Sequence, residues 1–185
     1  RVTETATGKT VAETDRDISW MPKGSRYYYI RKNVSGNDLV TVDARDLSET
    51  VLASGIPDGA FEVAPSEDYL LYTLTDEGPK EPEDIRRILE PDDRQPGWRN
   101  RSYLARYDLQ SGLLQRLTYG YRSAYFSGFS ADGREIVFSV GRQRITQRPF
   151  NLTSVYRMDV QTLRVDTLLA DEGFLSGCIL SPDGK

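Results

Sequence analysis

The sequence predicts an all-β protein assembled from repeated antiparallel sheets, and three observations support this fold class. The 185 residues include eleven tyrosines and many other strand-forming residues, and fifteen glycines and nine prolines suit tight turns between short strands. Long stretches with the 3.6-residue periodicity of a helix are nearly absent. A strand–turn–strand pattern recurs four times along the chain, which indicates a repeat architecture.

The recurring pattern is a short apolar strand, a polar turn and, where the chain continues, a second strand. Its four copies lie at 18–30, 61–74, 127–140 and 178–185. Proline presets the backbone of the first turn position, aspartate bonds to nearby backbone, and glycine adopts the left-handed conformation that closes the hairpin. The residues that we expect in these turns are Pro22, Pro65, Asp132, Gly133, Pro182, Asp183 and Gly184.

A second pattern lies between the copies of the first. It is an alternating strand that ends at an aspartate, then a turn and another alternating strand; the aspartates are Asp43, Asp108 and Asp159. Together the two patterns give four strands per unit, which is one blade of a β-propeller. The spacing from Pro22 to Pro65 falls within the roughly 40–45 residues of such a repeat. In the first unit, alternate rings of the tyrosines at 27–29 are expected to face core and solvent.

We therefore expect residues 1–185 to form a single segment of a β-propeller, with about three to four antiparallel four-stranded blades. The expected blade units span about 18–60, 61–120 and 121–173, and the next unit starts at 174–185. Propeller rings typically hold about four to eight blades. We interpret the chain as part of a larger ring, whose remaining blades are expected partners.

The second unit is longer than the first and contains a charged insertion at 76–101. Residues 82–90 predict a short helix, because proline starts it, acids occupy its first turn and Pro91 ends it. A long excursion between two strands must project from the ring, and such loops often carry function. The candidate docking or substrate-facing residues of this insertion are Glu81, Glu83, Asp84, Arg86, Arg87, Arg94 and Trp98.

Two interpretations of this insertion remain open. In the first, its arginines and Trp98 provide cationic and aromatic groups that dock a peptide or a neighbouring domain. In the second, it is a solvated surface loop whose charges keep it soluble. We favour the solvated interpretation for any single residue and the docking interpretation for the insertion as a whole.

The composition excludes several kinds of chemistry within this chain. It contains no histidine, which excludes a Ser-His-Asp triad, a Cys-His pair and an imidazole ligand for zinc. The single cysteine, Cys178, excludes an internal disulfide and a cysteine-rich metal cluster. A net charge of −4 argues against nucleic-acid binding, and no segment approaches the ~18 consecutive apolar residues of a membrane span. We expect no catalytic residue, no metal and no cofactor here.

Two of the turn segments resemble a known repeat. Residues 180–185 and 129–138 are similar to the WD40-like repeat of TolB-type propellers, which also forms the N-terminal propeller of prolyl oligopeptidase and dipeptidyl-peptidase-type serine peptidases. The first contains the Ser-Pro-Asp-Gly turn of that repeat, and the second has Ala131 in place of the proline. The turns at 21–25 and 64–68 depart from it because they lack the Asp-Gly pair.

The resemblance covers most of residues 18–185 and implies a non-catalytic segment that gates or docks peptide substrates for a serine peptidase. In that family a separate α/β-hydrolase domain carries the catalytic triad, so this domain and a peptide or protein ligand are the expected partners. Propeller insertions of dipeptidyl peptidases supply glutamates that hold the amino terminus of the substrate. The aromatic-flanked glutamate pair of that family is absent from 76–101, so this role is not transferred to the acids of the insertion.

An alternative function is also open at this stage. The resemblance equally implies a TolB-like periplasmic propeller that recruits protein partners and has no enzyme attached. A propeller enzyme that acts through carboxylates alone ranks last, because no two acids pair convincingly in the sequence. We expect a periplasmic or other extracytoplasmic bacterial location, with the cytoplasm as the alternative.

Overall fold

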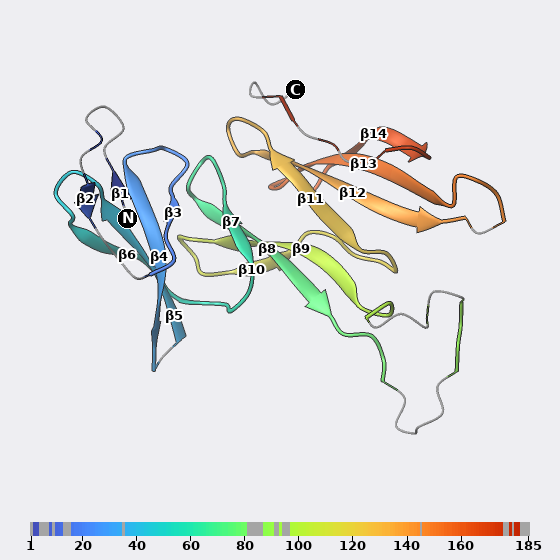
Figure 1. Ribbon diagram of the computed structural model, residues 1–185, viewed down its shortest axis with the longest axis horizontal. Coiled ribbons are helices and arrows are strands. Elements are labelled where there is room, and N and C mark those ends of the chain that lie inside the picture. Colours follow the sequence, from blue (N-terminus) through green and yellow to red (C-terminus); the bar gives the residue numbers. More distant parts are fainter. Residues whose placement is uncertain are drawn as a thin grey trace.

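The computed structural model is all-β, which confirms the predicted fold class. It describes residues 2–3, 8, 10–12, 16–34, 36–80, 87–90, 93, 97–144, 146–175, 178 and 180–181. Three four-stranded antiparallel sheets follow one another along the chain, and Figure 1 shows them side by side from blue to orange. Each sheet is a meander in which every strand pairs with the next one, as in a propeller blade.

The three sheets have the same strand order. The first contains β3 (Ser19–Trp20), β4 (Arg26–Asn33), β5 (Gly36–Asp43) and β6 (Glu49–Ile56). The second contains β7 (Phe61–Val63), β8 (Tyr69–Asp76), β9 (Arg101–Asp108) and β10 (Leu114–Arg116). The third contains β11 (Ala124–Phe129), β12 (Glu135–Gln143), β13 (Asn151–Asp159) and β14 (Val165–Glu172). A two-stranded ribbon of β1 (Val2–Thr3) and β2 (Thr10–Ala12) precedes them.

The turn between the first two strands of each sheet has one geometry. The amides of Gly24, Glu67 and Gly133 each donate to the carbonyl three residues earlier, at 3.0, 2.8 and 2.9 Å. These three residues have φ values of 89°, 60° and 72°, which is the left-handed region that glycine adopts most easily. Pro22, Pro65 and Asp132 lie within these turns, whereas Pro182, Asp183 and Gly184 lie outside the described residues.

The turn between the last two strands of each sheet depends on an aspartate. The side chains of Asp43, Asp108 and Asp159 accept hydrogen bonds from amides two or three residues later, at 2.8 to 3.2 Å. Their carbonyls accept from the amides of Leu47, Gly112 and Leu163, all of which have positive φ. An aspartate at the end of the third strand therefore satisfies backbone donors that the turn would leave free.

The sheets pack face to face, so the middle sheet is buried on both sides. Leu70 packs with Leu39 of the first sheet, and its neighbour Leu71 packs with Ile136 of the third. The strand that contains the tyrosines at 27–29 is also covered on both faces. The prediction that alternate rings face core and solvent is therefore wrong. Alternate rings face two different cores: Tyr28 packs toward Phe61 of the second sheet, and the other two lie in a cluster with Val2.

The helix expected at 82–90 is not seen among the described residues. Residues 81–86 lie outside them, and Arg87 to Glu90 are not helical. The carbonyl of Arg87 accepts from the Arg99 side chain at 2.7 Å, and the residue four positions later, Pro91, has no amide hydrogen to donate. A side-chain donor thus replaces the helical bond at this position. The described residues form no helix that is long and apolar enough to cross a membrane.

Candidate functional site

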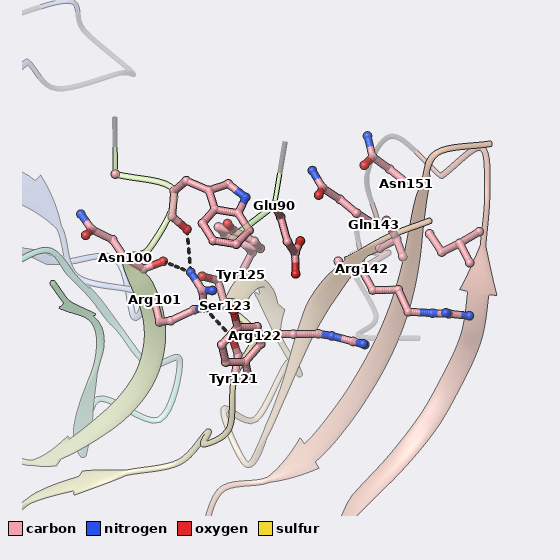
Figure 2. A pocket seen from close by; sticks show the side chains of 15 residues that line it. Glu90, Asn100, Arg101, Tyr121, Arg122, Ser123, Tyr125, Arg142, Gln143 and Asn151 are labelled. Atoms are coloured by element: carbon pink, nitrogen blue, oxygen red, sulfur yellow. Dashed lines mark hydrogen bonds between the residues drawn. The ribbon is translucent and has the colours of Figure 1, made fainter. Parts of the chain in front are cut away.

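A pocket of about 500 Å³ lies between the second and third sheets, at the strand ends opposite the turns described above. Three segments line it: the end of the insertion with the start of β9, the connection from β10 to β11, and the adjoining ends of β12 and β13. The antiparallel meander brings these segments to one face, because β8 and β12 end there and β9, β11 and β13 begin there. Figure 2 shows their side chains converging on the pocket.

Arg101 joins two of these segments. Its guanidinium lies over the ring of Tyr121, at 4.6 Å from the centroid, and 5.5 Å from that of Trp98. It donates to the backbone carbonyls of Trp98 at 2.7 Å and Asn100 at 2.8 Å, and also to that of Tyr121 (Figure 2). Within the described part of the chain no carboxylate pairs with Arg101. The ring and carbonyl contacts therefore fix the position of the guanidinium, and no described carboxylate neutralises its charge.

The two other arginines of the pocket differ in their pairing. Arg142 donates to both carboxylate oxygens of Asp171, at 2.8 and 2.7 Å, which raises the pKa of Arg142 and lowers that of Asp171. Arg122 is exposed, and no hydrogen bond or ion pair to another described residue is found for it; its charge acts on Asp171 at longer range. Glu90 is the one carboxylate among the described lining residues. The described lining of the pocket therefore carries a net positive charge.

Exposed aromatic rings surround these charges. Tyr121 and Tyr125 line the pocket with exposed fractions of 69% and 57%, and Trp98 is half-buried beside them. Aromatic and arginine side chains at a concave surface are the composition of binding hot spots, because they offer large rigid contact areas and directed hydrogen bonds.

A buried ion pair joins Asp93 and Arg99 within the insertion. Asp93 is fully buried and Arg99 is 11% exposed, and the guanidinium contacts both carboxylate oxygens, at 2.8 and 2.7 Å. The Asp93 carboxylate also accepts from the Leu89 amide at 3.1 Å. Removing one partner of a buried charge pair is strongly destabilising, because the remaining charge loses its closest compensation. Asp93 and Arg99 therefore hold parts of the insertion together, because Arg99 also donates to the carbonyls of Arg87 and Pro79.

The structure places the residues singled out from the sequence as follows. Trp98 lines the pocket, whereas Arg87 lies in the insertion and is not among the lining residues. The remaining candidates lie outside the described residues: Glu81, Glu83, Asp84, Arg86 and Arg94. The run at 142–148, which contains Arg142, is a possible anion site from the sequence, although a polar loop is the favoured interpretation. The sequence analysis did not single out Arg101 and Arg122, which come from the second and third repeat units. The signal that could have found them is topological, because the loops after the second and fourth strands of neighbouring blades lie on one face.

Comparison with known proteins shows the fold. No family model and no curated protein matches the sequence. The acylaminoacyl peptidase of Pyrococcus horikoshii matches with a TM-score of 0.54 and 15% identity over 86% of this chain and 26% of that one. Dipeptidyl peptidase 4 of Porphyromonas gingivalis matches with a TM-score of 0.50 and 18% identity over 85% of this chain and 20% of that one. TolB of Acinetobacter baumannii matches with a TM-score of 0.46 and 16% identity over 98% of this chain and 40% of that one.

The two peptidase matches confirm the resemblance to peptidase propellers at the level of the fold. The chain spans at most two fifths of the length of these three structures. Shared architecture does not by itself assign an activity, because one fold serves many functions.

Proposed function

We propose that this chain is a non-catalytic segment of a β-propeller in a serine peptidase-like protein, and that it docks peptides in the pocket between its second and third sheets. The observation that carries the proposal is the meeting of Trp98 and Arg101 with Tyr121 and Arg122 across two sheets. The fold shared with two peptidases supports the peptidase context. A separate α/β-hydrolase domain would carry the catalytic triad.

The chemistry of the pocket suits a peptide. Aromatic faces contact apolar side chains, and guanidinium groups bind carbonyl and carboxylate oxygens in a fixed geometry. A volume of about 500 Å³ lies within the range of pockets that enclose small ligands, so it holds a few residues of a peptide. The chain has no histidine to act as a general base, which favours binding over cleavage at this place.

The second candidate is a TolB-like propeller that recruits folded proteins. The observation that favours it is the extension of exposed aromatic surface beyond the pocket, at Tyr119, Phe150 and Phe174, which are 70%, 50% and 93% exposed. A folded partner would cover these rings together, whereas a short peptide would need only the pocket. Either function fits a periplasmic or other extracytoplasmic location, which we propose for the protein.

The test is binding of a fluorescent peptide library to the full chain, followed by calorimetry on the tightest peptides. Trp98→Ala and Arg101→Ala should each weaken binding by about tenfold or more, as expected of hot-spot residues. Trp20→Ala is the matched control, because Trp20 is an exposed tryptophan (52%) of the first sheet. An equal loss in the Trp20 variant, or no peptide binding at all, would overturn the docking role.

The peptidase context has its own test. The gene of the whole protein should encode a Gly-x-Ser-x-Gly strand–turn–helix segment followed by a histidine, and the whole protein should cleave chromogenic dipeptides. Absence of that segment, together with capture of a folded envelope protein through Tyr119 and Phe150, would support the second candidate instead.

A further inference from the structure

A second cavity, of about 450 Å³, adjoins the pocket described above. It is an apolar groove between the β10–β11 connection and the face of the third sheet, and Phe138, Val140, Met158 and Val165 contribute to its walls. Phe138 and Met158 are 5% and 4% exposed and belong to the core between the sheets, so this part of the groove is firmly packed. An apolar side chain of a ligand would find a preformed site there.

The two cavities share Tyr121 and Arg122. Arg122 therefore lies where the cationic pocket adjoins the apolar groove. Figure 2 shows its side chain extended from the β10–β11 connection toward Arg142, with its guanidinium end away from the ring of Tyr121. Asp171 pairs with Arg142, and three backbone carbonyls accept hydrogen bonds from the guanidinium of Arg101. Among the arginines in the described lining, Arg122 is therefore the one whose guanidinium has no hydrogen-bond or ion-pair partner among the described residues.

This arrangement selects a ligand with a carboxylate and an apolar group very close together. In the last residue of a peptide, the free carboxylate and the side chain are attached to the same Cα atom. An acidic residue inside a peptide places its carboxylate on a different residue from the apolar side chain, and so farther from it. The adjacency of one guanidinium and one apolar groove fits the first geometry.

We propose that the two cavities together bind the free carboxyl terminus of peptides whose last residue is apolar. Arg122 binds the terminal carboxylate through charge-assisted hydrogen bonds, and the groove at Phe138 and Met158 accepts the side chain. The proposal rests on the docking function above and specifies its ligand class.

The test compares three short peptides of one sequence by calorimetry with the full chain: one ending in leucine as the free acid, its carboxamide, and one ending in serine as the free acid. Both changes should weaken binding by about tenfold or more, since a charge-assisted hydrogen bond or a buried apolar side chain is lost. Arg122→Ala should weaken binding of the free acid by the same factor and leave the carboxamide unchanged. Arg45→Ala, an exposed arginine in a turn of the first sheet, should change neither.

Val165→Ser probes the groove without emptying the core, because Val165 is 45% exposed. This variant should reduce the preference for leucine over serine and keep the wild-type midpoint of unfolding. Equal binding of acid and carboxamide, with Trp98 still required, would overturn this inference and leave the docking function standing. Loss of acid and carboxamide alike in Arg122→Ala would overturn it too. If no peptide binds in a Trp98-dependent manner, both proposals are overturned.

Discussion

The phenol of Tyr69 donates a buried hydrogen bond to the backbone carbonyl of Gly133, at 2.8 Å. Tyr69 belongs to β8 of the second sheet, and Gly133 closes the first turn of the third sheet, 64 residues later. The Tyr69 ring, which is 1% exposed, also meets Phe129 of the third sheet edge-on, with centroids 6.1 Å apart. One side chain thus links two neighbouring sheets through both a polar and an aromatic contact.

Removing this hydroxyl should weaken the contact between the sheets. Tyr69→Phe leaves the Gly133 carbonyl buried without its donor, so we expect the free energy of unfolding to fall by about 1–2 kcal/mol. Urea denaturation followed by tryptophan fluorescence measures the change. Tyr125→Phe, which alters a ring that is 57% exposed, should have no measurable effect. Equal effects of the two substitutions would show that the buried hydrogen bond contributes nothing.

Gly133 itself should resist substitution for two separable reasons. Its φ of 72° strains any residue with a Cβ atom, and that atom would lie 2.9 Å from the amide nitrogen of Ser66 in the second sheet. Gly55 has a φ of 68° and open space around it. Gly55→Ala should therefore cost only the left-handed strain of about 1–2 kcal/mol. Gly133→Ala should cost measurably more in the same denaturation assay, and an equal loss would exclude the clash.

The aspartate in the last turn of the third sheet, Asp159, should make the free energy of unfolding depend on pH at acidic values. Amides of Thr162 and Gln161 and the Arg134 guanidinium bind the Asp159 carboxylate and lower its pKa to about 2 from the ordinary 3.8. Because the pKa of Asp159 is lower in the folded state, its carboxylate stabilises the fold above pH 3.8. This contribution is lost as the pH falls toward 2.

The Asp159→Asn variant tests this dependence. It should be less stable than the parent at pH 7, and the difference should shrink on acidification through that range. Thermal unfolding at several pH values measures it, with Asp17→Asn, an exposed carboxylate, as the control. A difference between parent and Asp159→Asn that is constant from pH 7 to pH 2 would contradict the prediction.

The buried Asp93–Arg99 pair should control the insertion and not the sheets. Arg99→Ala removes the guanidinium that contacts both oxygens of the buried Asp93 carboxylate, which costs about 3–5 kcal/mol locally, enough to loosen the insertion around Asp93. We expect faster proteolysis within the insertion and about tenfold weaker peptide binding, with an unchanged midpoint of global unfolding.

Lys80→Ala supplies a control within the same insertion. It removes an ion pair with Glu77 whose side chains are 82% and 68% exposed, and such pairs contribute little. Equal proteolysis of the Lys80 and Arg99 variants would show that burial of the ion pair is irrelevant.

The local features of this protein follow from its sequence because they depend on atoms a few residues apart. The turn that ends at Gly133 and the one that follows Asp159 are closed by bonds that span three or four residues. Residue types alone therefore predict four-stranded units and their all-β class. The same local reasoning failed in the insertion, where the Arg87 carbonyl binds a side chain twelve residues away instead of forming a helical bond.

The site was decided by the tertiary structure. Packing of the sheets buries both faces of β8 and brings Arg101 and Arg122 from different units to one pocket. It also determines that Asp171, 29 residues from Arg142, neutralises that arginine, while Arg122 forms no ion pair with a described residue. Local sequence patterns contain no information about these pairings, because the strength of a charge interaction depends on distance through space and on burial.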